Sequence, residues 1–204
     1  HELNSDFIAT FDLFLKTEAG LCRNTIVRYM KCFKRITNMA LAKEWMRKDP
    51  FYGYKMAQDE TDPVFLTYPE LKSIMEKEFT IPRLALVRDI FVFAAFTGLA
   101  FANVSTLTKD NLVQDNNGDW WIRKGRVKLE RRHRASSVCN IPLLPVPLAI
   151  LKKYEEHPIC RKKSLCLPVI CNQRMNSYLK EIADLCNIRK NLTTHTAKHS
   201  KIYI

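Results

Sequence analysis

Residues 192–199 read Leu192-Thr193-Thr194-His195-Thr196-Ala197-Lys198-His199. The two histidines are four positions apart, which places them on one face if the segment is helical. The segment follows residues 172–187, where apolar side chains recur with the period of an amphipathic helix. We therefore expect a short helix that carries His195, Lys198 and His199 after a longer helix.

The chain before these helices contains a segment that is apolar on nearly every side, residues 84–96. A membrane span needs about 20 residues, so this shorter segment is expected as the central helix of a core. Gly98 is placed to end it. Thr67 and Glu70 have the spacing of a capping box, which predicts the start of another helix at Thr67.

Between these helical parts the pattern changes to that of short strands. Residues 111–114, 120–122 and 137–141 are the expected strands, and Asn117-Gly118 is a strong signal for a hairpin turn between the first two. Trp120 and Trp121 are interpreted as packing residues of the sheet rather than as platforms for bases. The prolines after the third strand predict an irregular exit, with a helix over residues 148–154.

The N-terminal part is predicted to be helical throughout. A first helix is expected over residues 5–18, and a second is expected to begin at a cap on Asn24 or Thr25. A separate short helix is expected over residues 39–46. The polar run at residues 57–63 is the best linker, so the predicted domains are residues 1–60 and 61–204.

Charge is spread unevenly along a chain whose formal net charge is +12. Residues 1–62 hold 10 Lys and Arg against 9 Asp and Glu, whereas residues 63–204 hold 23 against 12. Residues 123–134 alone hold seven basic side chains, with Glu130 the one acidic residue among them. Such a segment is either a solvated loop or a contact for a polyanion, because like charges repel unless phosphates neutralise them.

The seven cysteines form no CxxC pair, and most have apolar neighbours in the sequence. That favours reduced, buried thiols of a cytosolic protein over a disulfide framework. His195 and His199 have the spacing of a zinc-protease motif, but Thr196 stands where that motif needs glutamate, so no metal site and no cofactor are predicted. The remaining alternative for these histidines is a capping or core role.

Four motifs, in this order, resemble those of tyrosine recombinases of the phage-integrase type, in particular the integrases of Bacteroides-type mobile elements. They are Phe96-Thr97-Gly98-Leu99-Ala100-Phe101-Ala102-Asn103-Val104, Ile141-Pro142-Leu143-Leu144-Pro145, Asn172-Gln173 with Tyr178-Leu179-Lys180-Glu181-Ile182-Ala183, and the stretch at residues 192–199. The resemblance implies a mainly α fold with a small three-stranded antiparallel sheet. It implies a helical, SAM-like core-binding domain followed by the recombinase catalytic-domain fold, incomplete at its C-terminus.

The resemblance also implies a chemistry. In this family a tyrosine attacks a DNA phosphodiester, two arginines and a histidine stabilise the phosphate, and a hairpin lysine protonates the leaving oxygen without a metal. Carried over by position, the histidine is His195, the second arginine is Lys198, and His199 is the histidine that often follows. The lysine maps to Lys128, with Arg126 and Lys124 as rivals. The first arginine position holds Ala100.

The nucleophile has no counterpart at the expected distance, since Tyr203 is only five residues after Lys198. We therefore expect a C-terminally truncated chain, which leaves two functions open. One is a site-specific recombinase or integrase, or a fragment of one; the other is an inactive relative that binds DNA. A soluble helical interaction protein is a third, weaker alternative.

The expected partner is double-stranded DNA, with self-association on DNA through the C-terminal region and a bacterial cytoplasmic location. The predicted DNA contacts are Arg28, Lys31, Arg35, Lys124, Arg126, Arg131 and Arg132.

Overall fold

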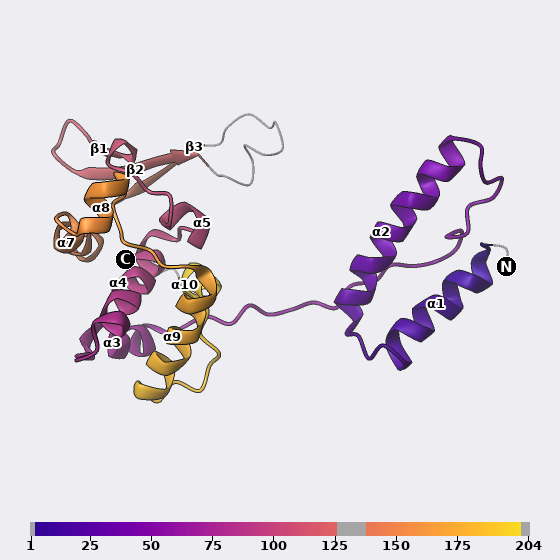
Figure 1. Cartoon of the computed structure of the whole chain (residues 1–204), viewed down its shortest axis with the longest axis horizontal. Helices are drawn as coiled ribbons and strands as arrows, with labels where there is room; N and C mark the ends of the chain where they lie inside the picture. The colour runs from indigo at the N-terminus through magenta and orange to yellow at the C-terminus, as the bar shows by residue number, and fades with distance from the viewer. Residues whose placement is uncertain (1–2, 126–137, 201–204) are drawn as a thin grey trace. The chain divides into compact units, whose positions relative to one another are not determined.

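The computed structural model describes residues 3–125 and 138–200, and it divides the chain into two compact units (Figure 1). Unit 1 is His1–Asp62 and unit 2 is Pro63–Ile204. The described part of unit 1 contains α1 (Ser5–Thr17) and α2 (Arg23–Ala42). The described part of unit 2 contains α3 (Tyr68–Glu76), α4 (Pro82–Thr97), α5 (Phe101–Val104), the 3-10 helix η1 (Lys109–Asn111), β1 (Leu112–Gln114), β2 (Trp120–Gly125), β3 (Val138–Pro142), α7 (Pro145–Tyr154), α8 (Pro158–Lys163), α9 (Asn172–Leu185) and α10 (Thr194–His199). The predicted fold class, mainly helical with three antiparallel strands, is confirmed.

Unit 1 consists of α1 and α2, and the chain after α2 packs back against both helices. Asn4 caps α1 by accepting a hydrogen bond from the Phe7 N–H. The core of the unit is small, and Phe33 joins it by an edge-on contact with Phe51 at 5.5 Å between ring centroids. Its fully packed members are Ile8, Leu15, Ile26, Met30 and Phe51.

The predicted division of the second helix is wrong, because α2 runs unbroken to Ala42. No glycine or proline interrupts the run, so nothing removes a hydrogen bond of the helical ladder. The predicted cap is also wrong, since Cys22 is the N-cap residue. The Asn24 amide instead bonds both backbone groups of Asp59, so it ties the end of the unit back to α2.

Unit 2 is built around α4, as its all-round apolar sequence predicts. The side chains of α4 from Asp89 to Thr97 are buried without exception. Gly98 ends the helix with φ of 65°, a left-handed conformation that costs glycine little. The Thr67–Glu70 capping box is confirmed at the start of α3.

The sheet has the order β1-β2-β3, with both pairs antiparallel. Ile122 is paired with Leu112 on one side and Ile141 on the other, and it has no exposed surface. The Asp115 carboxylate shapes the first turn by accepting hydrogen bonds from two backbone N–H groups and from Trp121 Nε1. The interpretation of the tryptophans holds for Trp121, whereas Trp120 remains 40% exposed.

The segment after the sheet differs from its prediction. Helix α7 begins at Pro145 rather than at residue 148, because proline is tolerated in the first helical turn, where its missing N–H would have no partner. Helix α8 was not predicted, and it presents Arg161, Lys162 and Lys163 in its last turn.

The expectation of buried thiols is wrong for most of the cysteines. All seven are free, but only Cys160 and Cys166 are buried. Cys22 and Cys171 are exposed because they are N-cap residues at helix ends, and Cys32 is exposed on α2. Within the described ranges, no helix is both long and apolar enough to span a membrane.

Candidate nucleic-acid interface

The first turn of α10 is fixed by hydrogen bonds within the turn and by hydrogen bonds that it donates to α9. Thr193 and Thr196 form a capping box, in which each side chain accepts from the backbone N–H of the other. The Thr194 N–H donates to Asn176 Oδ1 at 2.9 Å, and the Thr194 hydroxyl donates to Asn172 Oδ1 at 2.8 Å. Both asparagines lie on α9, so that helix sets the position of α10.

The other end of α10 is fixed to the beginning of unit 2. Ser200 Oγ accepts a 2.7 Å hydrogen bond from the Leu66 N–H and donates to the Thr196 carbonyl. Lys190, in the loop before α10, bonds the Phe65 carbonyl and Glu70 Oε2. These contacts leave α10 little freedom to rotate.

The orientation of α10 about its own axis places some of its side chains in the core and others in solvent. Thr196 and Ala197 are buried, whereas His195, Lys198 and His199 are exposed. The three predicted catalytic residues of the helix therefore share its solvent edge. His195 Nε2 lies 2.9 Å from His199 Nε2, with the rings nearly perpendicular.

The basic segment between β2 and β3 is described only at its beginning. Lys124 Nζ donates to the Thr106 carbonyl at 2.5 Å and to Asn111 Oδ1 at 3.0 Å, so its ammonium supports the loop beside the sheet. Arg123, one residue earlier, is exposed. The predicted residues Arg126, Lys128, Arg131 and Arg132 lie outside the described residues.

Unit 1 presents a second basic surface, along α2. The predicted contacts Arg28, Lys31 and Arg35 are all exposed on this helix. Lys31 also donates to Gln58 Oε1. Lys34 was not among the predicted contacts; it is half-buried, with its ammonium 5.7 Å from the centre of the Phe51 ring.

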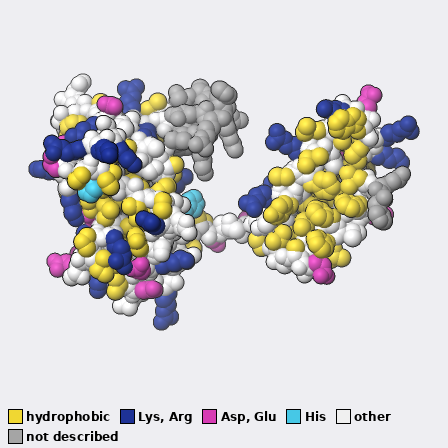
Figure 2. Space-filling model, viewed as in Figure 1, with side chains coloured by type: hydrophobic (Ala, Val, Ile, Leu, Met, Phe, Trp, Pro, Cys, Tyr) yellow, Lys and Arg dark blue, Asp and Glu magenta, His cyan; other side chains and the backbone are white. Residues whose placement is uncertain are grey.

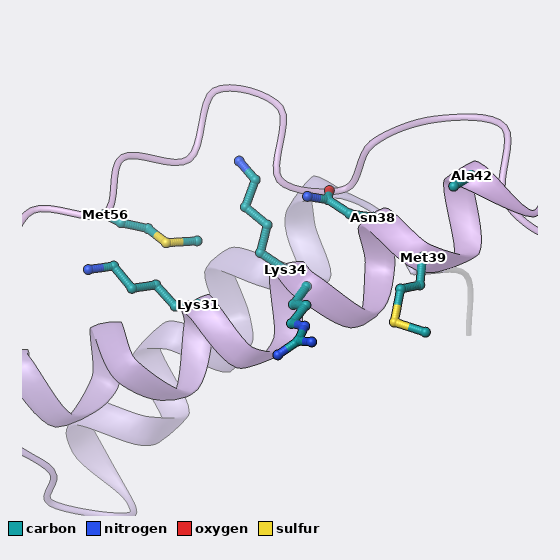
Figure 3. A pocket seen from close by; sticks show the side chains of 7 residues that line it. Lys31, Lys34, Asn38, Met39, Ala42 and Met56 are labelled. Atoms are coloured by element: carbon teal, nitrogen blue, oxygen red, sulfur yellow. The ribbon is translucent and has the colours of Figure 1, made fainter. Parts of the chain in front are cut away.

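The basic residues of α2 border a shallow groove of about 460 Å³ (Figure 3). In the close-up, the Lys31 side chain reaches toward Met56, which lies on the chain that passes α2. Lys31, Lys34, Arg35 and Asn38 recur at helical spacing, which indicates a polar edge along α2. That Met56 also lines the groove depends on the path of the chain after α2. The groove is lined by Lys31, Lys34, Arg35, Asn38, Met39, Ala42 and Met56.

The position assigned to the first arginine has no cationic side chain. Ala100 is half-buried at the N-cap of α5 and presents a methyl group. Elsewhere on unit 2, Figure 2 shows Lys and Arg side chains spread over the visible face, with acidic and hydrophobic side chains between them. The excess of basic over acidic residues in residues 63–204 favours an anionic partner even without this arginine.

One buried charge in unit 2 is structural. Asp89 of α4 accepts hydrogen bonds from Arg88 Nε, Lys153 Nζ and the Tyr154 hydroxyl, all at 2.7–2.8 Å. Burial and the hydrogen bond to Asp89 raise the pKa of Tyr154. The contacts of Asp89 with Lys153 and Tyr154 join α4 to α7, and the Asp89 carboxylate that accepts them is buried.

Known proteins resemble the chain at two levels. Residues 1–56 match the family model described as a phage integrase SAM-like domain. Over almost its whole length the chain superimposes on the solved XerH site-specific recombinase bound to palindromic difH substrate, with a TM-score of 0.66 and 17% identity, covering 97% of this chain and 60% of that one. The fold is that of the tyrosine recombinases.

Two further structures share this recombinase fold. The Tn1549 transposon integrase, in complex with circular intermediate DNA, has a TM-score of 0.69 at 17% identity and is matched over 98% of this chain and 72% of its own. A lambda integrase dimer bound to a COC′ core site has a TM-score of 0.72 at 12% identity, over 96% and 68%. No curated protein matches this sequence. The chain thus spans between three fifths and three quarters of these recombinase chains.

Proposed function

We propose that the chain acts on DNA as a site-specific recombinase or integrase, or as a part of one, in the cytoplasm of a bacterium. The observation that carries the proposal is the exposed edge of α10. On a fold shared with recombinases, the edge presents His195, Lys198 and His199 together, and the motif resemblance assigns these three residues to the reacting phosphate.

The proposed roles follow from the chemistry of each side chain. His195 donates a hydrogen bond to a non-bridging phosphate oxygen as negative charge develops there. Lys198 supplies charge to the same group, but it lacks the two-pronged hydrogen bonding of arginine. Lys128 is assigned to protonate the leaving oxygen. Ala100 leaves one cationic contact unfilled, so we expect weaker stabilisation of the phosphate than with a full set.

DNA contact is assigned to two surfaces, α2 and the segment from Lys124 to Arg132. The first test measures binding to a 30-base-pair duplex across a range of salt concentrations. A protein that neutralises several phosphates shows a steep decrease in affinity with salt. Combined alanine replacement of Arg126, Lys128, Arg131 and Arg132 is expected to flatten that slope. Unchanged binding would remove this segment from the interface.

The matched control for the quadruple variant removes the same amount of charge from another surface. The four control residues are all exposed and were not assigned to DNA: Lys152, Lys162, Lys163 and Lys180. Their combined replacement by alanine changes the net charge equally. We expect it to reduce the salt slope less than the assigned set does.

The alternative function is DNA binding without cleavage. We expect DNA binding without a covalent link under this alternative, because Ala100 and Lys198 stand where the resemblance places the two arginines that stabilise the phosphate. Incubation with a nicked suicide substrate, followed by denaturing electrophoresis, tests this. A covalent adduct would overturn the inactive alternative and show that the chain contains a nucleophile. The same substrate would then serve to measure self-association on DNA.

A further inference from the structure

Trp120, the tryptophan that the core leaves partly exposed, lines a pocket of about 530 Å³ between the sheet and α7. Small-molecule sites commonly have volumes of about 300–1,000 Å³ and a mostly apolar lining with a few polar groups. The pocket has both properties. Its apolar walls come from the sheet, from α7 and from the chain on either side of them: Leu112, Trp120, Leu143, Leu148, Leu151 and Leu165.

Backbone hydrogen bonds hold the walls of the pocket in place. The Leu143 N–H donates to the Trp120 carbonyl at 2.8 Å, which ties the chain before α7 to the sheet. On the far side, the Cys166 N–H donates to the Leu107 carbonyl, also at 2.8 Å, and Leu165 forms a β-bridge with Thr108. The pocket is therefore formed before a ligand arrives, so binding does not have to order its walls.

The polar groups of the pocket carry a net positive charge. Lys109 Nζ lies 2.9 Å from Glu155 Oε1, so this carboxylate already has a cationic partner. Lys152 is exposed, and it forms no ion pair with another residue in the described ranges. Burial raises the pKa of Cys166 to about 11, so its thiol is neutral at physiological pH and adds to the apolar lining. Lys152 is thus the cation that an anionic ligand would neutralise.

We propose that the pocket between the sheet and α7 binds a compact aromatic carboxylate. Its ring would lie against the Trp120 indole in an offset stack, with leucine side chains around it. Its carboxylate would pair with the Lys152 ammonium at the rim. The lining residues include none of those assigned to DNA, so the inference goes beyond the proposed function and does not rest on it.

The probe is 2-naphthoate, whose two fused rings match the flat indole wall. The chain contains three tryptophans, so a ¹⁵N-labelled sample gives few indole N–H signals to follow. We expect the Trp120 signal to shift saturably, whereas the signal of Trp45, an exposed tryptophan of unit 1, stays in place. Equal shifts of both signals would show a general affinity for exposed indoles and overturn the site. So would the absence of a saturable shift at millimolar 2-naphthoate.

Replacement of Lys152 tests the charge. Lys152→Gln is expected to weaken 2-naphthoate binding about twofold to fivefold in isothermal titration calorimetry, the range for a partly exposed ion pair. The matched control is Lys180→Gln, because Lys180 is exposed on α9 and does not line the pocket. 2-Naphthamide has the same rings without the charge, so Lys152→Gln should not change its binding. An equal effect on both ligands, or none on either, would overturn the carboxylate assignment.

Replacement of Trp120 tests the apolar wall. Trp120→Ala is expected to weaken 2-naphthoate binding about threefold to tenfold, as loss of an aromatic pair predicts. Trp45→Ala is the control, and well-dispersed spectra show that each variant folds. Unchanged affinity in Trp120→Ala would place the ligand elsewhere and overturn the proposal. A blocked dipeptide of aspartate and phenylalanine that binds more tightly than 2-naphthoate would also overturn it, because the pocket would then accept a protein side chain.

Discussion

The Leu66 N–H donates a 2.7 Å hydrogen bond to Ser200 Oγ, across 134 positions of the sequence. Both residues are buried, at 5% and 4% exposure. The bond joins the first residues of unit 2 to the end of α10, the helix that carries the candidate catalytic side chains. The same hydroxyl donates to the Thr196 carbonyl, so the Ser200 side chain bonds the backbone both of Leu66 and of α10.

Replacement of Ser200 by alanine is expected to destabilise unit 2 by about 1–3 kcal/mol, the cost of leaving a buried donor without an acceptor. Urea denaturation measures the free energy of unfolding. Ser73→Ala is the control, because the Ser73 hydroxyl bonds the Glu70 carbonyl at an exposed position. An equal decrease in the free energy of unfolding for both variants would show that the buried hydrogen bond of Ser200 contributes no more than the exposed one of Ser73.

Asp89→Asn is expected to cost about 3 kcal/mol, near the lower end for removing one member of a buried ion pair, because Lys153 retains access to water. The amide keeps one acceptor oxygen, but the negative charge that assists the bonds from Arg88 and Lys153 is lost. Glu181→Gln provides the contrast, since Glu181 and Arg83 form an exposed pair. Exposed pairs are worth about 0–1 kcal/mol. Thermal or urea unfolding of both variants checks the difference.

Glu70 is expected to make stability depend on pH. Burial alone would raise the pKa of Glu70, but hydrogen bonds from Lys190 and Thr67 and the charge of Lys190 outweigh it and lower the pKa. A carboxyl whose pKa is lower in the folded state stabilises the protein at pH values above the pKa of that group in the unfolded state. That contribution is lost as the pH falls through the pKa of the group in the folded state.

The test compares the free energy of unfolding from pH 6 to pH 3 for the unmodified chain and for Glu70→Gln. The variant is expected to lose less stability on acidification. Glu76→Gln, which removes an exposed partner of Lys72, is the control and should follow the unmodified chain. Identical acid dependence in all three proteins would contradict the assignment.

Alanine replacement of Arg28, Lys31 and Arg35 is expected to weaken duplex binding at every sequence tested. Each phosphate contact that is lost should reduce the salt slope by about 0.9. Lys16, Arg47 and Lys48 are exposed on other parts of unit 1 and provide a control of equal charge. Fluorescence anisotropy at several salt concentrations measures both slopes, and equal slopes would remove α2 from the interface.

Features that depend on neighbours in the sequence could be predicted. The left-handed end of α4 at Gly98, the Thr67–Glu70 capping box and the Asn117-Gly118 turn all follow from local rules. The helical spacing of His195 and His199 was local as well. The predicted break in α2 and the late start of α7 failed where weak local signals were read as helix ends.

Features that depend on distant parts of the chain could not be predicted. Asn172 belongs to one of the quoted motifs and Asn176 is a polar residue of α9, but neither pattern indicates that both accept hydrogen bonds from the first turn of α10. Asp89 lies in an apolar run, and the cations that neutralise it include Lys153 from another helix. Nothing in the spacing of these residues identifies their partners.

By itself, the sequence determined the central helix α4, the three strands, the basic character of residues 63–204 and the presence of two histidines at helical spacing, because each depends on residue type and local period. Only the tertiary structure decided which side of α10 faces solvent. Two hydrogen bonds fix that rotation: the Thr194 N–H donates to Asn176 Oδ1, and the Leu66 N–H donates to Ser200 Oγ. They bury Thr196 and Ala197, and they bring His195 and His199 together on the exposed edge.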